Sequence, residues 1–205
     1  MTGARRAVLA TRNAHKVGEI AALLAAPLPA LHLLALDAEG LPAVPEVVES
    51  GTTFAANALL KARAACAATG LPALADDSGL CVDVLGGAPG VFSARWSGRH
   101  GDDAANLSLL LGQLADVPDG ERGASFVCAA AVVLPGGHEE VRSGRLAGSL
   151  VRAPRGERGF GYDPAVVPAG EQRTLAEMSA AEKNAISHRA RAFAALADAL
   201  PRLLA

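Results

Sequence analysis

The sequence predicts an α/β fold in which helices flank a mixed β-sheet. Two observations support this prediction. Near the N-terminus, a short apolar strand, an amphipathic helix and a second apolar strand follow one another, which is typical of a parallel strand pair. Further along, two strand-like runs are joined by Pro135-Gly136-Gly137, which indicates a hairpin. A sheet that contains both kinds of pair is mixed.

In the first half, apolar spacing and turn residues set the limits of the elements. Apolar residues from Val17 to Leu24 line one side of a helix, which Pro27 ends. A longer helix is closed by Gly70, which suits a left-handed C-cap. In chain order we expect a strand at 7–10, a helix after residue 13, a strand at 31–35, an acidic loop at 37–51, a helix at about 53–69 and, around a sharp Asp76-Asp77 turn, an apolar run at 71–74 and a strand at 80–84.

The second half continues with alternating loops, strands and helices. Leucines at helical spacing follow Asp102, which is a good N-cap residue. In chain order we expect a glycine-rich loop at 86–90, a helix capped near Asp102, hairpin strands at 126–134 and 138–145, an Arg-rich loop at 152–159 and a C-terminal helix with Ala190, Phe193, Leu196 and Leu200 on its apolar face.

Composition limits the class of protein. With 205 residues, the chain has the length of a single domain, 1–205, and 51% hydrophobic but 3% aromatic residues predict an Ala/Leu/Val core. A net charge of -2 argues against a nucleic-acid polymer as partner. Cys66, Cys81 and Cys128 are too few and too far apart for a disulfide framework. Without a secretory h-region or membrane span, we expect a soluble, cytoplasmic protein with no membrane partner.

The segment Ala75-Asp76-Asp77-Ser78-Gly79 is the strongest chemical signal. Two adjacent carboxylates repel each other unless a cation or a proton lies between them. Magnesium prefers carboxylate oxygens and is commonly shared with substrate phosphates. A divalent-metal site is therefore one interpretation, and a solvated turn is the other, because Asp, Ser and Gly all form turns.

Lysine scarcity favours the metal and phosphate interpretation. Of 19 Lys and Arg residues, only Lys16, Lys61 and Lys183 are lysine. An ammonium is a compact point charge, whereas a guanidinium is a planar fork. Because the chain otherwise uses arginine, we interpret each lysine as a position that requires an ammonium, with chance retention on the surface as the alternative.

Two further segments suggest a nucleotide. Thr11, Asn13 and Lys16 lie where a strand opens into a helix, and free N–H groups at a helix N-terminus bind phosphate, although Asn13 also suits a simple N-cap. The segment 160–163 offers a flat ring, and Ser187-His188-Arg189 offers donors for a base edge. Core packing of Phe160 and a capped helix start are the alternatives. Together these segments predict a nucleoside triphosphate as substrate.

The ordered motifs resemble those of the noncanonical purine nucleoside triphosphate pyrophosphatases, the inosine/xanthosine triphosphate diphosphatase family. The resemblance runs nearly end to end. The matching motifs are Thr11-x-Asn13-x-x-Lys16, Gly51-x-Thr53-Phe54-x-x-Asn57-Ala58-x-x-Lys61-Ala62, Ala75-Asp76-Asp77-Ser78-Gly79-Leu80, Leu85-Gly86-Gly87-x-Pro89-Gly90-x-x-Ser93-Ala94-Arg95, Gly159-Phe160-Gly161-Tyr162-Asp163-Pro164 and Glu182-Lys183-x-x-x-Ser187-His188-Arg189.

The resemblance implies an elongated mixed β-sheet, two lobes with an active-site cleft between them, a homodimer and a Mg2+ requirement. It implies cleavage of ITP, dITP or XTP to the monophosphate and pyrophosphate, with Asp77 as general base and metal ligand. Asp76 and Glu49, preferred over Glu46, are the other expected metal ligands. The expected substrate contacts are Thr11, Arg12, Asn13, Ala14, His15, Lys16, Lys61, Ser78, Phe160, Gly161, Tyr162, Asp163, Lys183, His188 and Arg189.

Three positions depart from the family pattern, and two other functions compete. Arg12 replaces a usual Gly, Ala56 a usual Glu, and Leu146-Ala147 a usual Trp-Pro. A phosphoribosyltransferase also uses Asp-Asp after an apolar strand, but there a Thr/Gly-rich phosphate loop follows, whereas Ser78-Gly79 leads into an apolar run. A nucleotide-binding regulator without turnover is the second alternative, suggested by Ala56.

Overall fold

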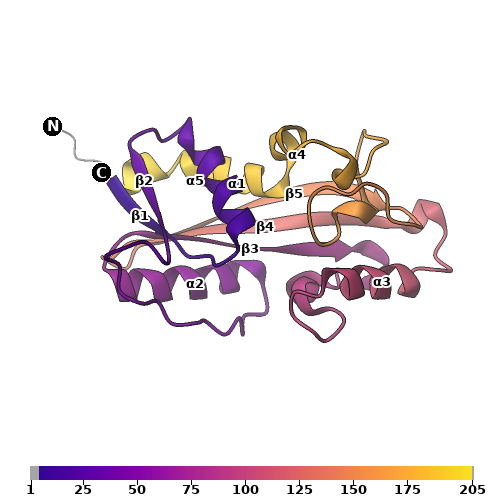
Figure 1. The fold of residues 1–205 in the computed structure, drawn as a ribbon, viewed down its shortest axis with the longest axis horizontal. Coiled ribbons are helices and arrows are strands. Elements are labelled where there is room, and N and C mark those ends of the chain that lie inside the picture. The colour runs from indigo at the N-terminus through magenta and orange to yellow at the C-terminus, as the bar shows by residue number, and fades with distance from the viewer. Residues whose placement is uncertain (1–4, 205) are drawn as a thin grey trace. The chain divides into compact units, whose positions relative to one another are not determined.

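A computed structural model describes residues 5–204, without the side chains of Ala14 and His15. Its centre is a six-stranded sheet in the order β2-β1-β3-β4-β5-β6 (Figure 1). The strands are β1 (Arg5–Leu9), β2 (Leu31–Ala35), β3 (Ala73–Val82), β4 (Gly123–Val133), β5 (Glu139–Leu150) and β6 (Val166–Pro168).

The sheet is mixed, as the sequence predicts. Strand β1 runs parallel to β2, with Arg5 opposite Leu31, and parallel to β3, with Val8 opposite Ala73. Strands β4 and β5 are joined by a tight turn in which the Leu134 N–H donates to the His138 carbonyl. Strand β6, which the sequence did not predict, pairs antiparallel with β5.

The helix limits follow the predicted caps. The Thr53 hydroxyl accepts from the Ala56 N–H at the start of α2, and Gly70 ends that helix with φ of 66°. Asp102 caps α3 in the same way through Ala105. The helices are α1 (Ala14–Ala25), α2 (Phe54–Thr69), α3 (Asp103–Gln113), α4 (Ala180–Ile186), α5 (His188–Ala197) and α6 (Leu200–Leu203), with 3₁₀ turns at Asp83–Leu85, Gly90–Arg95, Asp119–Glu121, Asp163–Ala165 and Leu175–Glu177.

The chain divides into two compact units, each built from separate segments. Unit 1 comprises residues 1–77, 128–144 and 189–205, and unit 2 comprises residues 78–127 and 145–188. The chain passes from one unit to the other within β3, β4 and β5 and again after His188.

Unit 1 has three layers because its strands alternate between two apolar faces. On one face, Leu9, Leu74 and Cys128 pack with residues of α1, α5 and α6. On the other, small side chains such as Ala75 pack with the alanines of α2. Figure 1 shows α1 and α5 on one side of the sheet and α2 on the other. Neighbouring strand residues therefore contact different helices.

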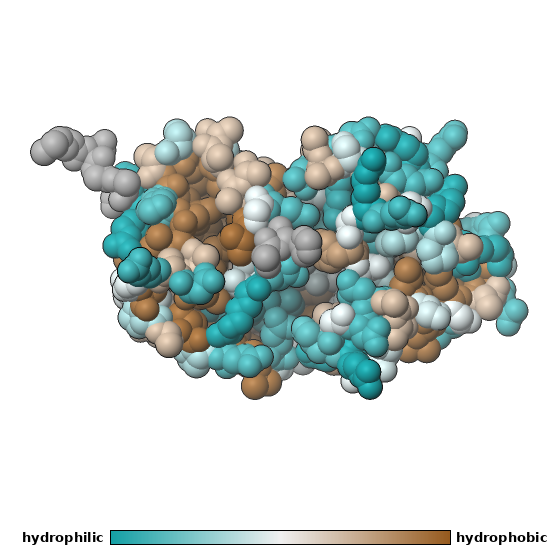
Figure 2. All heavy atoms as spheres, in the orientation of Figure 1, coloured by the Kyte–Doolittle hydropathy of each residue, from teal (hydrophilic) through white to brown (hydrophobic). Residues whose placement is uncertain are grey.

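Unit 2 buries one apolar cluster, which includes Leu80, Phe126 and Tyr162. Its Arg-rich loop, residues 152–159, is exposed throughout, as predicted. Hydrophilic residues gather over the unit 2 loops that follow β5 (Figure 2). Within residues 5–204, no helix combines the length and the apolar character that a membrane span requires.

A buried arginine, Arg122, ties three segments of unit 2 together. Its side chain is 1% exposed, and it donates to the carbonyls of Leu150 at 2.9 Å, Leu114 at 2.6 Å and Val151 at 3.0 Å. Burial lowers the pKa of Arg122. These hydrogen bonds hold the end of α3 against the end of β5.

Replacing Arg122 with methionine should lower the free energy of unfolding by ~3 kcal/mol, because three buried carbonyls lose a charged donor. Urea denaturation measures the change. The control Arg173→Met removes an exposed arginine and should cost less than ~1 kcal/mol. Equal losses in the two variants would contradict a structural role for Arg122.

Two sequence predictions are wrong. Asp76 and Asp77 lie in the middle of β3 and form no turn. Their charges are met by tertiary partners, so the local turn preference of Asp, Ser and Gly is overridden. The C-terminal helix is also two helices, because Pro201 lacks an N–H and cannot continue α5.

Candidate active site

The two adjacent aspartates of β3 contact different helices. Successive side chains of a strand point to opposite faces. Accordingly, Asp76 contacts Lys16 of α1 and Arg189 of α5, whereas Asp77 contacts α2. The two carboxylates therefore have different cationic partners, Lys16 and Arg189 for Asp76 and Lys61 for Asp77.

Asp76 is a fully buried carboxylate surrounded by positive charge. Its Oδ2 lies 3.0 Å from Lys16 Nζ and 3.4 Å from Arg189 Nε, and Cys128 Sγ lies 3.9 Å away. Burial opposes ionisation, but Lys16, Arg189 and Lys61 together hold the pKa of Asp76 well below its usual range. The ionised form of Asp76 is therefore favoured, and its Oδ2 accepts a hydrogen bond from Lys16 Nζ.

The pKa of Asp77 is shifted in the opposite direction from that of Asp76. Its Oδ1 lies 3.2 Å from Lys61 Nζ, and its Oδ2 accepts from Asn57 Nδ2 at 3.2 Å. Burial raises the pKa of Asp77, and the nearby Glu49 charge adds to this, against the opposing effect of Lys61. A carboxylate with a raised pKa beside one with a lowered pKa is the pattern expected of a general base next to a fixed charge.

Glu49 and Asp77 are two carboxylates that share one partner, the Lys61 ammonium. Lys61 Nζ also bonds Glu49 Oε1 at 2.8 Å, and although burial alone would lower the pKa of Lys61, Asp77, Glu49 and Asp76 raise it. Glu46 is exposed, whereas Glu49 is half-buried. Among the side chains that the structure describes, no group of three or more His, Cys, Asp or Glu is placed to hold a metal ion. Two carboxylates nevertheless suit magnesium, which completes its shell with water and substrate phosphate.

The predicted phosphate segment lies at the β1–α1 junction of unit 1. Asn13 Oδ1 accepts from the Lys16 N–H at 3.3 Å, and Thr11 Oγ1 accepts from the Asn13 N–H at 3.2 Å. Asn13 therefore caps the helix. Arg12 is exposed and donates to the Val44 carbonyl. The side chains of Ala14 and His15, also predicted to bind substrate, lie outside those described.

In unit 2, the segment Phe160 to Asp163 packs with Lys183. Asp163 Oδ2 lies 2.7 Å from Lys183 Nζ and accepts from the Phe160 N–H at 2.9 Å. Lys183 Nζ lies 4.7 Å from the centroid of the Phe160 ring. The Gly161 N–H donates to Asp103 and the Tyr162 hydroxyl to the Ser93 carbonyl. The ring, the ammonium and the carboxylate thus form one fixed group.

The predicted donors at the start of α5 belong to different units. His188 lies in unit 2, where its ring stacks on Phe126 with centroids 4.9 Å apart and 13° between the planes. Arg189 lies in unit 1, where it binds Asp76 and Glu19. Ser187 is the C-cap of α4, and Ser78 is half-buried in β3.

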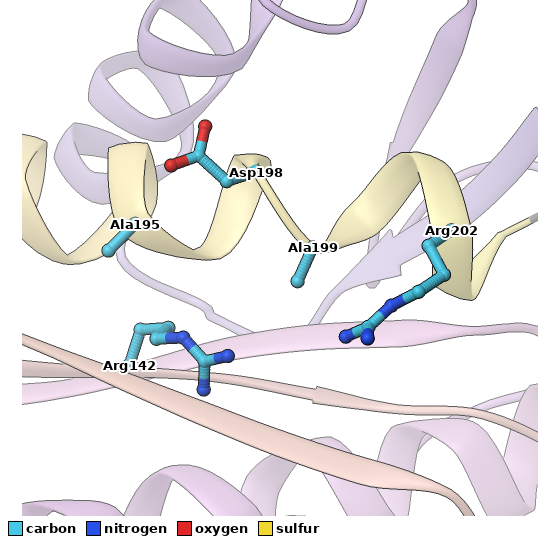
Figure 3. Close-up of a pocket in the computed structure, with 5 residues that line it drawn as sticks. All are labelled: Arg142, Ala195, Asp198, Ala199 and Arg202. Carbon is cyan, nitrogen blue, oxygen red and sulfur yellow. The ribbon is translucent and has the colours of Figure 1, made fainter.

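None of the predicted site residues lines a surface groove of unit 1. It has a volume of about 570 Å³ and is lined by Arg142, Ala195, Asp198, Ala199 and Arg202. Figure 3 shows Arg142 on a strand and Arg202 on the helix that faces it. Both arginines bind Glu140, so one carboxylate offsets part of their positive charge.

Comparison with known proteins places the chain in a family. A sequence model of the Ham1 family matches residues 7–199. The chain belongs to the Ham1 family. This membership agrees with the family resemblance of the motifs and with the mixed α/β sheet, since solved Ham1 proteins have the same fold.

Relatives of this Ham1-family chain match it over almost its full length. The dITP/XTP pyrophosphatase of Streptomyces coelicolor is 62% identical over 200 residues, which cover 97% of this chain and 98% of that protein. A HAM1 protein from Coxiella burnetii is 40% identical, with a TM-score of 0.86 and coverage of 97% and 99%. The nucleoside-triphosphatase / dITP/XTP pyrophosphatase structure from Mycobacterium abscessus is 52% identical, with a TM-score of 0.77 and coverage of 93% and 98%.

Three residues that contact predicted site residues were not assigned from the sequence. Asn57 contacts Asp77, Glu19 contacts Arg189, and Phe126 stacks on His188. Asn57 belongs to a quoted motif, so its spacing of four residues before Lys61 was an available signal. Glu19 is three residues after Lys16 on α1 and was the nearest acidic candidate. Phe126 gave no signal, because a buried aromatic in a strand is ordinary core packing.

Proposed function

We propose that this protein hydrolyses noncanonical purine nucleoside triphosphates, namely dITP, XTP and ITP, to the nucleoside monophosphate and pyrophosphate. The observation that carries the proposal is the split aspartate pair of β3. One carboxylate has a lowered pKa beside Lys16 and Arg189, and the other has a raised pKa, due mainly to burial, beside Lys61 and Glu49. The high identity to proteins named dITP/XTP pyrophosphatase supports the substrate class.

In the proposed reaction, unit 1 handles the triphosphate. Lys16 and the N–H groups at the start of α1 bind phosphate oxygens, and Lys61 supplies a second ammonium. Asp77 orients a water molecule and accepts its proton as the oxygen attacks the α-phosphorus. Magnesium, for which we propose Glu49 and Asp77 as ligands, would neutralise charge on the polyphosphate. Positioning and charge stabilisation suffice for such a transfer, so no protein nucleophile is needed.

We assign base recognition to unit 2. The Phe160 ring offers a flat surface with the Lys183 ammonium 4.7 Å from its centroid, and His188 can present a further donor. Hypoxanthine and xanthine accept hydrogen bonds at the 6-oxygen, whereas adenine donates there. The Lys183 ammonium can only donate, so it suits a 6-oxo base, whereas adenine would place a donor against a donor.

One assay tests this function against its alternatives. Wild-type protein is incubated with dITP and Mg2+ but without a phosphoribosyl acceptor, and pyrophosphate and dIMP are quantified. Equal amounts of both are expected. A phosphoribosyltransferase would release neither, and a regulator would bind dITP without turnover. dATP is the matched control substrate, and turnover of dATP as fast as of dITP would contradict the proposed specificity.

We further propose that the protein is a cytoplasmic homodimer. The free thiols of Cys66, Cys81 and Cys128 are compatible with a reducing compartment. Exposed apolar side chains in unit 2, such as Phe92 and Val84, offer surface for a second copy. Sedimentation analysis measures the mass in solution.

Phe126 provides a test of base recognition by His188. Phe126→Leu removes the ring that fixes the imidazole plane, and such aromatic pairs contribute ~0.5–1.5 kcal/mol, so the dITP/dATP ratio of kcat/KM should fall by about 2–10-fold. Leu110→Ala, in the same apolar cluster, is the control for core damage. A ratio that falls equally in both variants would refute a specific role of the stack.

A further inference from the structure

The side chain of Asn57 connects the two carboxylates that the proposed metal site requires. Asn57 is completely buried in α2. Its Oδ1 accepts from the Gly51 N–H at 2.8 Å, and its Nδ2 donates to Asp77 Oδ2 at 3.2 Å. Both ends of the amide are therefore used, one on the loop before α2 and the other on β3.

The loop end of this connection lies next to Glu49. Gly51 follows Glu49 by two residues, so fixing the Gly51 backbone limits where the Glu49 side chain can reach. The approach at Gly51 is close, because a Cβ there would lie 2.6 Å from Asn57 Oδ1 and 2.8 Å from Ala56 Cβ. Only glycine allows the loop backbone to approach Asn57 in this way.

Lys61 makes a second link between the same two acids. Its Nζ lies 2.8 Å from Glu49 Oε1 and 3.2 Å from Asp77 Oδ1. The ammonium and the Asn57 amide thus approach different oxygens of Asp77. The ammonium can move on its flexible stem when another cation arrives. A buried amide with both ends bonded cannot, so Asn57 is the rigid link.

We propose that Asn57 is a positioning residue that sets the separation and orientation of the Glu49 and Asp77 carboxylates for a divalent cation. This inference rests on the proposed function, in which those two residues hold the metal. In this proposal Asn57 acts through its hydrogen bonds to Gly51 and Asp77 and is not itself a metal ligand. Residues that orient metal ligands typically change metal affinity or activity by about 10–100-fold when replaced.

The test measures metal affinity without turnover. Mn2+ binding to the free protein is measured by calorimetry for the wild type, Asn57→Leu, Asp77→Asn and the double variant. Asn57→Leu keeps the side-chain shape but loses both hydrogen bonds, and its Mn2+ affinity should fall about tenfold. If Asn57 acts through Asp77, the double variant should bind no more weakly than Asp77→Asn alone.

The matched control is Thr53→Ala, which removes the N-cap of the same helix and leaves Asp77 untouched. This variant should lower Tm but keep wild-type Mn2+ affinity. Asn57→Ala, measured alongside, guards against misfolding of the leucine variant. Unchanged affinity in both Asn57 variants, additive losses in the double variant, or no Mn2+ binding by the wild type would each overturn the proposal.

Pyrophosphate release from dITP by the wild type is recorded in parallel. A wild type that releases pyrophosphate while the Asn57 variants bind Mn2+ normally would refute the positioning role and leave the proposed function intact. A wild type that releases none, with the coupled loss of Mn2+ affinity still observed, would refute the function and support the positioning role.

Discussion

Replacing Asp77 with asparagine should abolish most turnover of dITP while the protein remains folded. The amide cannot accept a proton from water and also removes the charge of a proposed metal ligand. Loss of a general base alone typically lowers the rate by ~10²–10⁴-fold. Steady-state pyrophosphate release at saturating Mg2+ and dITP measures kcat. Activity within a few-fold of wild type would exclude Asp77 as the catalytic carboxylate.

The stability of this variant has a predicted sign. An Asp whose pKa is raised by folding is harder to ionise in the folded chain than in the unfolded chain, so its ionisation opposes folding as the pH rises above its unfolded pKa. Burial gives Asp77 such a raised pKa. Asp77→Asn should therefore not lower Tm at neutral pH. The control Asp116→Asn changes an exposed carboxylate and should keep both Tm and kcat.

Local sequence signals predicted the ends of elements well where a cap residue decides them. Gly70 ends α2 in the left-handed conformation, and Asp102 begins α3. Strand β2 has the predicted limits, Leu31–Ala35. Each of these features depends on a few neighbouring residues, so the chain itself carries the information.

Local sequence signals gave the wrong secondary structure where residues far away in the chain decide the conformation. Asp76 and Asp77 favour a turn locally, but Lys16, Arg189 and Lys61 make a continuous strand possible by meeting their charges. Those partners are up to 113 residues away in the chain. No local pattern shows which face of β3 each carboxylate will occupy, because that depends on the pairing of the whole sheet.

Lysine scarcity singled out three residues that the structure pairs with carboxylates, and their role in binding substrate stays a prediction. Each of the three lysines pairs with a buried or half-buried carboxylate, Lys16 with Asp76, Lys61 with Asp77 and Glu49, and Lys183 with Asp163. The sequence identified the cations, but it did not identify their partners.

Replacing Lys16 with arginine should lower kcat/KM for dITP by ~10²-fold, because small misplacements of a bound group cost that much. Lys16 Nζ lies 3.0 Å from Asp76 Oδ2, and Arg189 already approaches the same oxygen at 3.4 Å. A second guanidinium would have to share this crowded carboxylate, so its planar fork would be displaced from the position of the ammonium. The triphosphate would then bind in a shifted position.

Two variants separate charge from geometry at this position. In Lys16→Arg the buried charge of Asp76 still has two cations, so Tm should stay close to wild type while kcat/KM falls. In Lys16→Ala one cation is lost, and removing one partner of a buried ion pair costs about 3–5 kcal/mol, so Tm should fall as well. Differential scanning calorimetry and initial rates with dITP measure the two effects. Near-normal kinetics for Lys16→Arg would show that the phosphate site accepts either cation, and the rarity of lysine in this chain would then carry no functional meaning.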